Sequence, residues 1–109
     1  MQLLLVNLHR EELLDEVLSI LIEMELPDAV VVESRSGLEL LERDIPIFAG
    51  LRSLVPSGID FSSLVVCVIR DDGLAGEVLA AIGAIIGGGR DASRTNTAVL
   101  LPVTGAVSF

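Results

Sequence analysis

The stretch Leu64-Val65-Val66-Cys67-Val68-Ile69-Arg70-Asp71-Asp72 decides the fold. Its first part is apolar and mostly β-branched, which is typical of a strand. Asp71 or Asp72 then supplies a side chain that can cap a helix. Beyond them one apolar stripe recurs at helical spacing, formed by Leu74, Val78, Ile82 and Ile85. We therefore predict a strand followed by a helix over about residues 73–86, which ends at the glycines after it.

The same alternation of strand and helix continues outward from this stretch. Apolar runs at residues 2–8, 29–33 and 97–101 predict three more strands, and a helix is predicted between the first two. The order β-α-β, a long connection, then β-α-β is the split βαβ pattern of ferredoxin-like domains. We therefore expect one α+β domain over residues 1–109, with two helices on one face of an antiparallel four-stranded sheet.

The other helix is predicted over residues 10–24. Its apolar stripe is formed by Leu14, Val17, Leu18 and Leu21. Asn7 or His9 is expected to cap its N-terminus, and Pro27 stops it.

Composition limits the class of function. The chain has 109 residues and a formal net charge of -9, and all of its basic residues are arginine. This charge argues against a partner with a phosphate backbone, so we expect no nucleic-acid binding. No apolar run is long enough for a membrane helix, so we expect no membrane insertion and a cytoplasmic location.

The predicted strands are apolar at successive positions, so both faces of the sheet should be apolar. Two helices can cover only one of these faces, and the other needs a partner. We expect self-association there; the alternative is that the segment 34–62 folds under the sheet. The second helix also carries a small-residue face, which we expect to pack tightly on its own sheet, the alternative being close approach of a second copy: Gly76, Ala80, Gly83, Ala84 and Gly87.

The segment 34–62 is unusually long for a connection in a compact domain, and such loops tend to be functional. A short helix is predicted to start near residues 44–46 and to run to about residue 55. Charged and apolar side chains alternate in the segment, and Arg35, Phe48 and Arg52 are candidates for contact with a partner protein. The alternative is that its apolar residues pack on a neighbouring subunit.

The turn after the second helix is the candidate ligand site. Glycine N–H groups can converge on an anion, and arginine can pair with phosphate. The candidate residues are Gly87, Gly88, Gly89, Arg90 and Arg94. The alternative is a helix cap followed by a plain turn.

The sequence predicts no catalytic residue and no metal site. His9, Glu12 and Glu16 would share one face only if the first helix already included His9. Cys67 is predicted to be a small buried side chain with a raised pKa. A catalytic cysteine needs a base beside it, and His9 is the chain's only histidine. We therefore expect no enzyme activity, and an enzyme on the same fold is the disfavoured alternative.

The element order, the long loop after the second strand and the glycine-rich turn resemble the nitrogen-regulatory P-II-like proteins. The stretches 7–18 and 45–52 are similar to a divergent branch of that group. The resemblance implies a ferredoxin-like subunit in a homotrimer whose sheets pack around the threefold axis. It also implies a small effector, often an adenine nucleotide, in clefts between subunits, and a long loop that signals to a target protein.

The chain departs from the family pattern at three points. It has no tyrosine for nucleotidylation, no lysine in the turn 87–96 and no arginine after the last strand. The effector and any cofactor are therefore not assigned. We predict a P-II-like regulatory or sensor protein that acts through the loop 35–60, and the alternative is a trimeric metal-tolerance protein similar to the CutA group.

Overall fold

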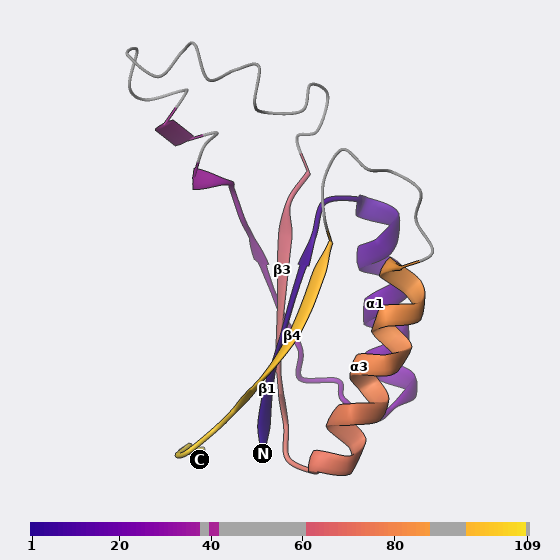
Figure 1. The fold of residues 1–109 in the computed structure, drawn as a ribbon, viewed down its shortest axis with the longest axis vertical. Coiled ribbons are helices and arrows are strands. Elements are labelled where there is room, and N and C mark those ends of the chain that lie inside the picture. Colours follow the sequence, from indigo (N-terminus) through magenta and orange to yellow (C-terminus); the bar gives the residue numbers. More distant parts are fainter. Residues whose placement is uncertain (38–39, 42–60, 88–95, 109) are drawn as a thin grey trace.

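A computed structural model describes residues 1–37, 40–41, 61–87 and 96–108 of the chain. Its elements are β1 (Gln2–Leu8), α1 (Glu11–Glu23), β2 (Val30–Glu33), β3 (Ser63–Ile69), α3 (Asp72–Ile86) and β4 (Thr97–Pro102). The strands form one antiparallel sheet in the order β2-β3-β1-β4, and both helices lie on the same side of it (Figure 1). The predicted α+β arrangement of ferredoxin-like type is thus confirmed.

The core lies between the sheet and the two helices. Alternate residues of β1 and β3 point into it, because successive side chains of a strand lie on opposite faces. These strand residues are Leu4, Val6, Leu8, Val65, Cys67 and Ile69, and the helices add Leu13, Val17, Leu21, Ala75, Val78 and Ile82. The predicted stripes are confirmed at Val17, Leu21, Val78 and Ile82; Leu14, Leu18, Leu74 and Ile85 pack around this core and remain partly exposed.

The start of α1 differs from the prediction. Asn7 still belongs to β1, and the N-cap is Arg10, whose backbone is extended and whose side chain makes no capping hydrogen bond. His9 does not cap the helix, since it lies one residue before the N-cap; its backbone N–H donates to Asn96 Oδ1 at 2.9 Å. The expectation of an Asn7 or His9 cap was therefore wrong: the N-cap position falls one residue beyond His9.

The start of α3 is the one that the sequence predicts. Asp71 is the N-cap, and its Oδ1 accepts a hydrogen bond from the Leu74 backbone N–H at 3.1 Å. Gly87 ends the helix, and its N–H donates to the Gly83 carbonyl at 2.9 Å. The small-residue face is placed wrongly by the prediction, because Gly76, Ala80, Gly83, Ala84 and Gly87 are exposed, and the sheet is contacted by the larger residues of α3.

The turn from α1 into β2 is tightly hydrogen-bonded. The Leu26 N–H donates to the Leu21 carbonyl at 2.8 Å, and the Glu25 N–H donates to the Ile22 carbonyl at 3.0 Å. These two bonds form a Schellman motif, which usually carries glycine at its left-handed position. Here that position is Glu25, with φ of 61°. Pro27 follows the motif, so α1 ends before this proline, as the sequence predicts.

Candidate functional site

One end of the sheet carries the borders of both connections that the sequence singled out. The register places Leu8 beside Ser63 and Asn7 beside Thr97, and Glu33 also pairs with Ser63. We call this the loop end, because the segment 34–62 and the turn 88–95 both enter and leave the fold there (Figure 1). The described borders of the turn that was predicted to bind a ligand and of the loop that was predicted to bind a partner therefore lie at one end of the molecule.

Three hydrogen bonds tie the borders of these connections. The Ser34 and Ser62 hydroxyls lie 2.6 Å apart, and the Ser34 N–H donates to the Ser62 carbonyl at 3.1 Å. On the helix side, the bond from the His9 N–H to Asn96 Oδ1 joins the start of α1 to the residue before β4. Both connections are thus fixed at their roots.

Most of the predicted site residues lie outside the described part of the chain. Gly88, Gly89, Arg90 and Arg94 of the ligand turn belong to this group, as do Phe48, Arg52 and the helix expected from residues 44–46 to 55. Gly87 is described and acts as the C-cap of α3. Arg35 is exposed just after β2, where a side chain of the long loop can reach another molecule.

His9, Glu12 and Glu16 do not share one face of a helix, as a metal site there would require. The reason is that α1 begins at Glu11 and His9 precedes it. Within the residues that the structure describes, no group of three or more histidine, cysteine or acidic side chains is placed to hold a metal ion.

The face of the sheet opposite the helices is apolar across all four strands. We call it the open face, and it is made of Leu3, Leu5, Asn7, Val30, Val32, Leu64, Val66, Val68, Thr97, Val99 and Leu101. Val30 keeps 57% of its surface exposed, Val68 keeps 47% and Leu101 keeps 45%. No described helix covers this face (Figure 1).

Charge is distributed unevenly between the two sides of the sheet. The open face carries no charged side chain, although the chain has 16 acidic residues. The acids of α1 and α3 lie on the helix side, among them Glu11, Glu12, Asp15, Glu16 and Glu77. The open face is therefore suited to an apolar contact, and the helix layer is suited to solvent.

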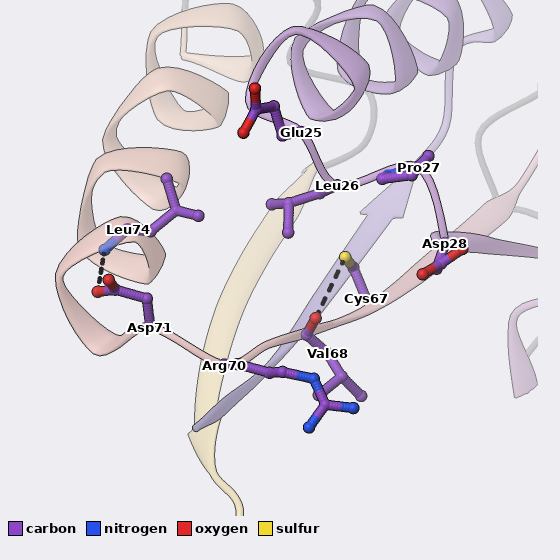
Figure 2. Close-up of a pocket in the computed structure, with 9 residues that line it drawn as sticks. All are labelled: Glu25, Leu26, Pro27, Asp28, Cys67, Val68, Arg70, Asp71 and Leu74. Carbon is purple, nitrogen blue, oxygen red and sulfur yellow. Dashed lines mark hydrogen bonds between the residues drawn. The ribbon is translucent and has the colours of Figure 1, made fainter. Parts of the chain in front are cut away.

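A cavity of about 270 Å³ lies at the end of the sheet opposite the loop end (Figure 2). Three segments line it: the turn after α1, the last residues of β3 and the first turn of α3. The lining residues are Glu25, Leu26, Pro27, Asp28, Cys67, Val68, Arg70, Asp71 and Leu74. It brings the thiol, three carboxylates and one guanidinium to the same place.

The Cys67 thiol faces this cavity from the core side of β3. Its side chain is buried, as the sequence predicts, and Sγ lies 3.8 Å from the Val68 carbonyl oxygen. Burial raises the pKa of the Cys67 thiol, and the Asp28 carboxylate raises it further. At neutral pH the cavity therefore has a neutral thiol in its wall.

No sequence pattern predicted this cavity. Its members lie as far apart in the chain as Glu25 and Leu74, and no motif links them. The one available signal was the concentration of charged and turn residues at 25–28 and 70–72, directly beyond two apolar elements. Such residues are ordinarily explained by helix ends alone.

The comparisons with known proteins find no match: no family model fits the chain, and no curated protein is significantly similar to it. Among the described helices, none has the length and apolar character needed to cross a bilayer.

Proposed function

We propose that the protein is a P-II-like regulatory or sensor protein without an activity of its own. It assembles as a homotrimer through the open face, binds a small effector where subunits meet and signals through the loop 35–60 to a partner protein. The observation that carries the proposal is the open face: apolar on four strands, uncharged and uncovered by a described helix.

Assembly through this face has a clear driving force. Exposed apolar patches of this kind mark interaction surfaces, because removing them from water is favourable by roughly 25 cal/mol per Å². A second copy is a suitable occupant, since two neutral faces meet while the acidic helix layers stay apart on the outside. The choice of three copies comes from the family resemblance.

The shared loop end supports the sensing part of the proposal. An effector held by Arg90 and Arg94 would lie in the connection that leads into Asn96, which bonds to the start of α1. The loop 35–60 has its roots at the same end, at Ser34 and Ser62. A change in order of one connection can therefore act on the other over a short distance.

The assembly is tested with a charge placed in the open face. Light scattering should give the wild type a mass three times the 11.5 kDa of one chain. Val66→Asp buries a carboxylate between subunits and should give a folded monomer by light scattering and circular dichroism. Ala80→Asp adds the same charge to the exposed side of α3 and should remain a trimer. A monomeric wild type at micromolar concentration contradicts the proposal.

The effector is tested with thermal unfolding in the presence of ATP, ADP, AMP or 2-oxoglutarate. A ligand at a hundred times its dissociation constant stabilises the fold by about 2.7 kcal/mol and raises the melting temperature by several degrees. Arg90→Ala should remove this shift, while Arg10→Ala, at the start of α1, should keep it. A shift that survives Arg90→Ala removes that residue from the site.

A further inference from the structure

β2 is an edge strand whose residues are all exposed. It lies at one edge of the sheet order β2-β3-β1-β4, and three of its four residues are valine. Val30 and Val32 belong to the open face, and Val31, on the helix side, still exposes 41% of its surface. The helices pack mainly on β1, β3 and β4, which is why Val31 stays exposed there. A free apolar edge of this kind is a template for an added strand.

The backbone groups of β2 alternate between β3 and the free edge. The Ser34 N–H donates to the Ser62 carbonyl, so Ser34 directs its backbone groups at β3. Because these groups alternate along an antiparallel ladder, the even-numbered residues of β2 also face β3. Val31 and Glu33 therefore direct their N–H and C=O groups away from β3, where the described sheet has no further strand.

β4 forms the opposite edge of the sheet and has a matching pattern. The Val103 N–H donates to the Met1 carbonyl, so the odd-numbered residues of β4 face β1. Ala98, Leu100 and Pro102 direct their backbone groups to the free edge. Pro102 has no N–H, so this edge offers two donors, spaced two residues apart like the two of β2.

We propose that the free edge of β2 pairs antiparallel with the free edge of β4 in a second copy of this chain. Val31 lies opposite Leu100 of the partner subunit, and Glu33 lies opposite Ala98 of the partner subunit. This register uses the N–H donors of both edges and places Pro102 of the partner subunit beyond the end of β2. The strand directions agree, because β2 runs parallel to β1 and β4 runs antiparallel to it. Copies related by an axis along the strands therefore meet with these edges antiparallel.

Charge favours β4 over a second β2 as the occupant of this edge. Two β2 strands paired antiparallel would bring Glu33 of each copy near Asp28 of the other. Residues 95–109, which include β4, carry no charged side chain. Pairing between two different edges is also a head-to-tail contact, and contacts of this kind generate closed rings, whereas a contact of like edges generates a dimer.

This pairing deepens the proposed function and rests on it, because it names the segments that join the subunits. When the edges join, three sheets form a closed ring with the open face inside and the acidic helix layer outside. Val31 is then covered by the partner subunit, since α3 packs on β4. Closure also removes the free edges, which otherwise favour aggregation.

The first experiment is a disulfide cross-link between the two strands. The register places Val32 opposite Val99 of the partner subunit in a non-hydrogen-bonded pair, whose Cα atoms lie about 4.5 Å apart, within the span of a disulfide. Within one chain, β3 and β1 separate the two residues by about 14 Å, which a disulfide cannot span. Val32→Cys combined with Val99→Cys, in a Cys67→Ala background, should therefore give covalent trimers on a non-reducing gel after mild oxidation.

Two controls isolate the edge from the face. Each single cysteine variant should run as a monomer on the same gel. Leu5 lies beside Val99 on the open face, one strand further from the edge. Val32→Cys combined with Leu5→Cys should therefore give no cross-link, whereas a contact of face against face does not distinguish these two positions by strand.

A second variant removes a donor of the free edge and leaves β3 untouched. Val31→Pro loses the outward N–H but keeps the hydrogen bonds to β3, so the single chain should fold, which circular dichroism reports. Each junction loses a hydrogen bond, so trimer formation should weaken about ten- to a hundred-fold in a dilution series followed by light scattering. Val31→Thr keeps the donor and the branched side chain and should assemble like the wild type.

The outcomes separate this pairing from the proposed function. A trimeric wild type whose cysteine pair gives no cross-link, or gives no more than the Leu5→Cys control, overturns the pairing and leaves the open-face trimer standing. Equal assembly of Val31→Pro and Val31→Thr does the same. A ladder of cross-linked species longer than three sustains the pairing and overturns the trimer. A monomeric wild type overturns both.

Discussion

Glu25 occupies a backbone conformation that suits another residue. Its φ of 61° closes the Schellman motif after α1, where a side chain costs roughly 1–2 kcal/mol and glycine costs none. Glu25→Gly should therefore raise the free energy of unfolding by about 0.5–1 kcal/mol, since the mobile unfolded chain takes back part of the gain. Urea denaturation with an unchanged slope is the measurement.

A control lies two residues earlier. Glu23 belongs to the last turn of α1 with ordinary helical geometry, so Glu23→Gly should lower the free energy of unfolding by up to about 1 kcal/mol. If both glycine variants lose stability, the left-handed conformation does not set the energy of this turn.

Cys67 should make the fold sensitive to alkali. Burial and the Asp28 carboxylate raise the pKa of the Cys67 thiol above its ordinary value of 9.0. Below pH 9.0 the thiol stays protonated in both the folded and the unfolded chain, so it causes no loss of stability. As pH rises through this value toward the folded pKa, the unfolded chain loses the proton first, so stability falls by at most about 1.4 kcal/mol per pH unit.

The measurement is urea unfolding of the wild type and Cys67→Ala between pH 8 and pH 10.5. The comparison is of slopes against pH, because the variant also loses core packing at all pH values. The wild type should lose stability more steeply. Parallel curves would mean that the thiol has its ordinary pKa in the folded chain.

At the scale of elements, α3 is notable for the glycines on its exposed side. An added Cβ at Gly83 meets nothing within 4 Å, whereas one at Gly87 lies 2.8 Å from the Gly83 carbonyl oxygen. Gly83→Ala should stabilise by about 0.5–1 kcal/mol, because glycine is unfavourable within a helix. Gly87→Ala should give no gain. Thermal unfolding of the pair is the measurement.

Gly83→Ala also tests whether subunits meet at the open face or at α3. The proposed assembly uses the open face, so Gly83→Ala should keep the oligomeric mass of the wild type. A loss of mass in that variant would place the subunit contact on α3 instead.

Sequence patterns predicted the elements well where local signals were strong. The strand of residues 64–69, the Asp71 cap and the end of α3 at Gly87 each follow from adjacent residues. The start of α1 and the exposed side of α3 were wrong, because both depend on what packs against the helix. Arg10 is the N-cap by its extended backbone alone, without a side-chain hydrogen bond. In α3 the apolar side chains pack against the sheet, and the glycines lie on the opposite, exposed side.

At the scale of the whole molecule, the net charge of -9 opposes the meeting of copies that the open face favours. Salt screens the repulsion, since the Debye length falls from about 30 Å at 0.01 M to about 3 Å at 1 M. The proposed trimer should therefore dissociate less at 0.5 M than at 0.02 M sodium chloride. Analytical ultracentrifugation measures this, and Val66→Asp should stay monomeric at both concentrations.

Of the two candidate sites, the sequence predicted one and not the other. The apolar residues at successive positions of each strand predicted the open face, because successive side chains point to opposite faces of the sheet. The cavity beside Cys67 could not be predicted in this way. It exists only because the sheet order brings the end of β3 against the turn after α1 and the start of α3.

The central place of β1 has a consequence for synthesis on the ribosome. Both of its neighbours in the sheet, β3 and β4, come later in the chain, and the last ends at Pro102. At about 5–20 residues per second, β1 waits roughly 5–20 s after its own emergence before its second neighbour exists. A strand apolar on both faces is an aggregation hazard for all of that time, so the yield of folded chain should depend on chaperones that hold the nascent N-terminal segment.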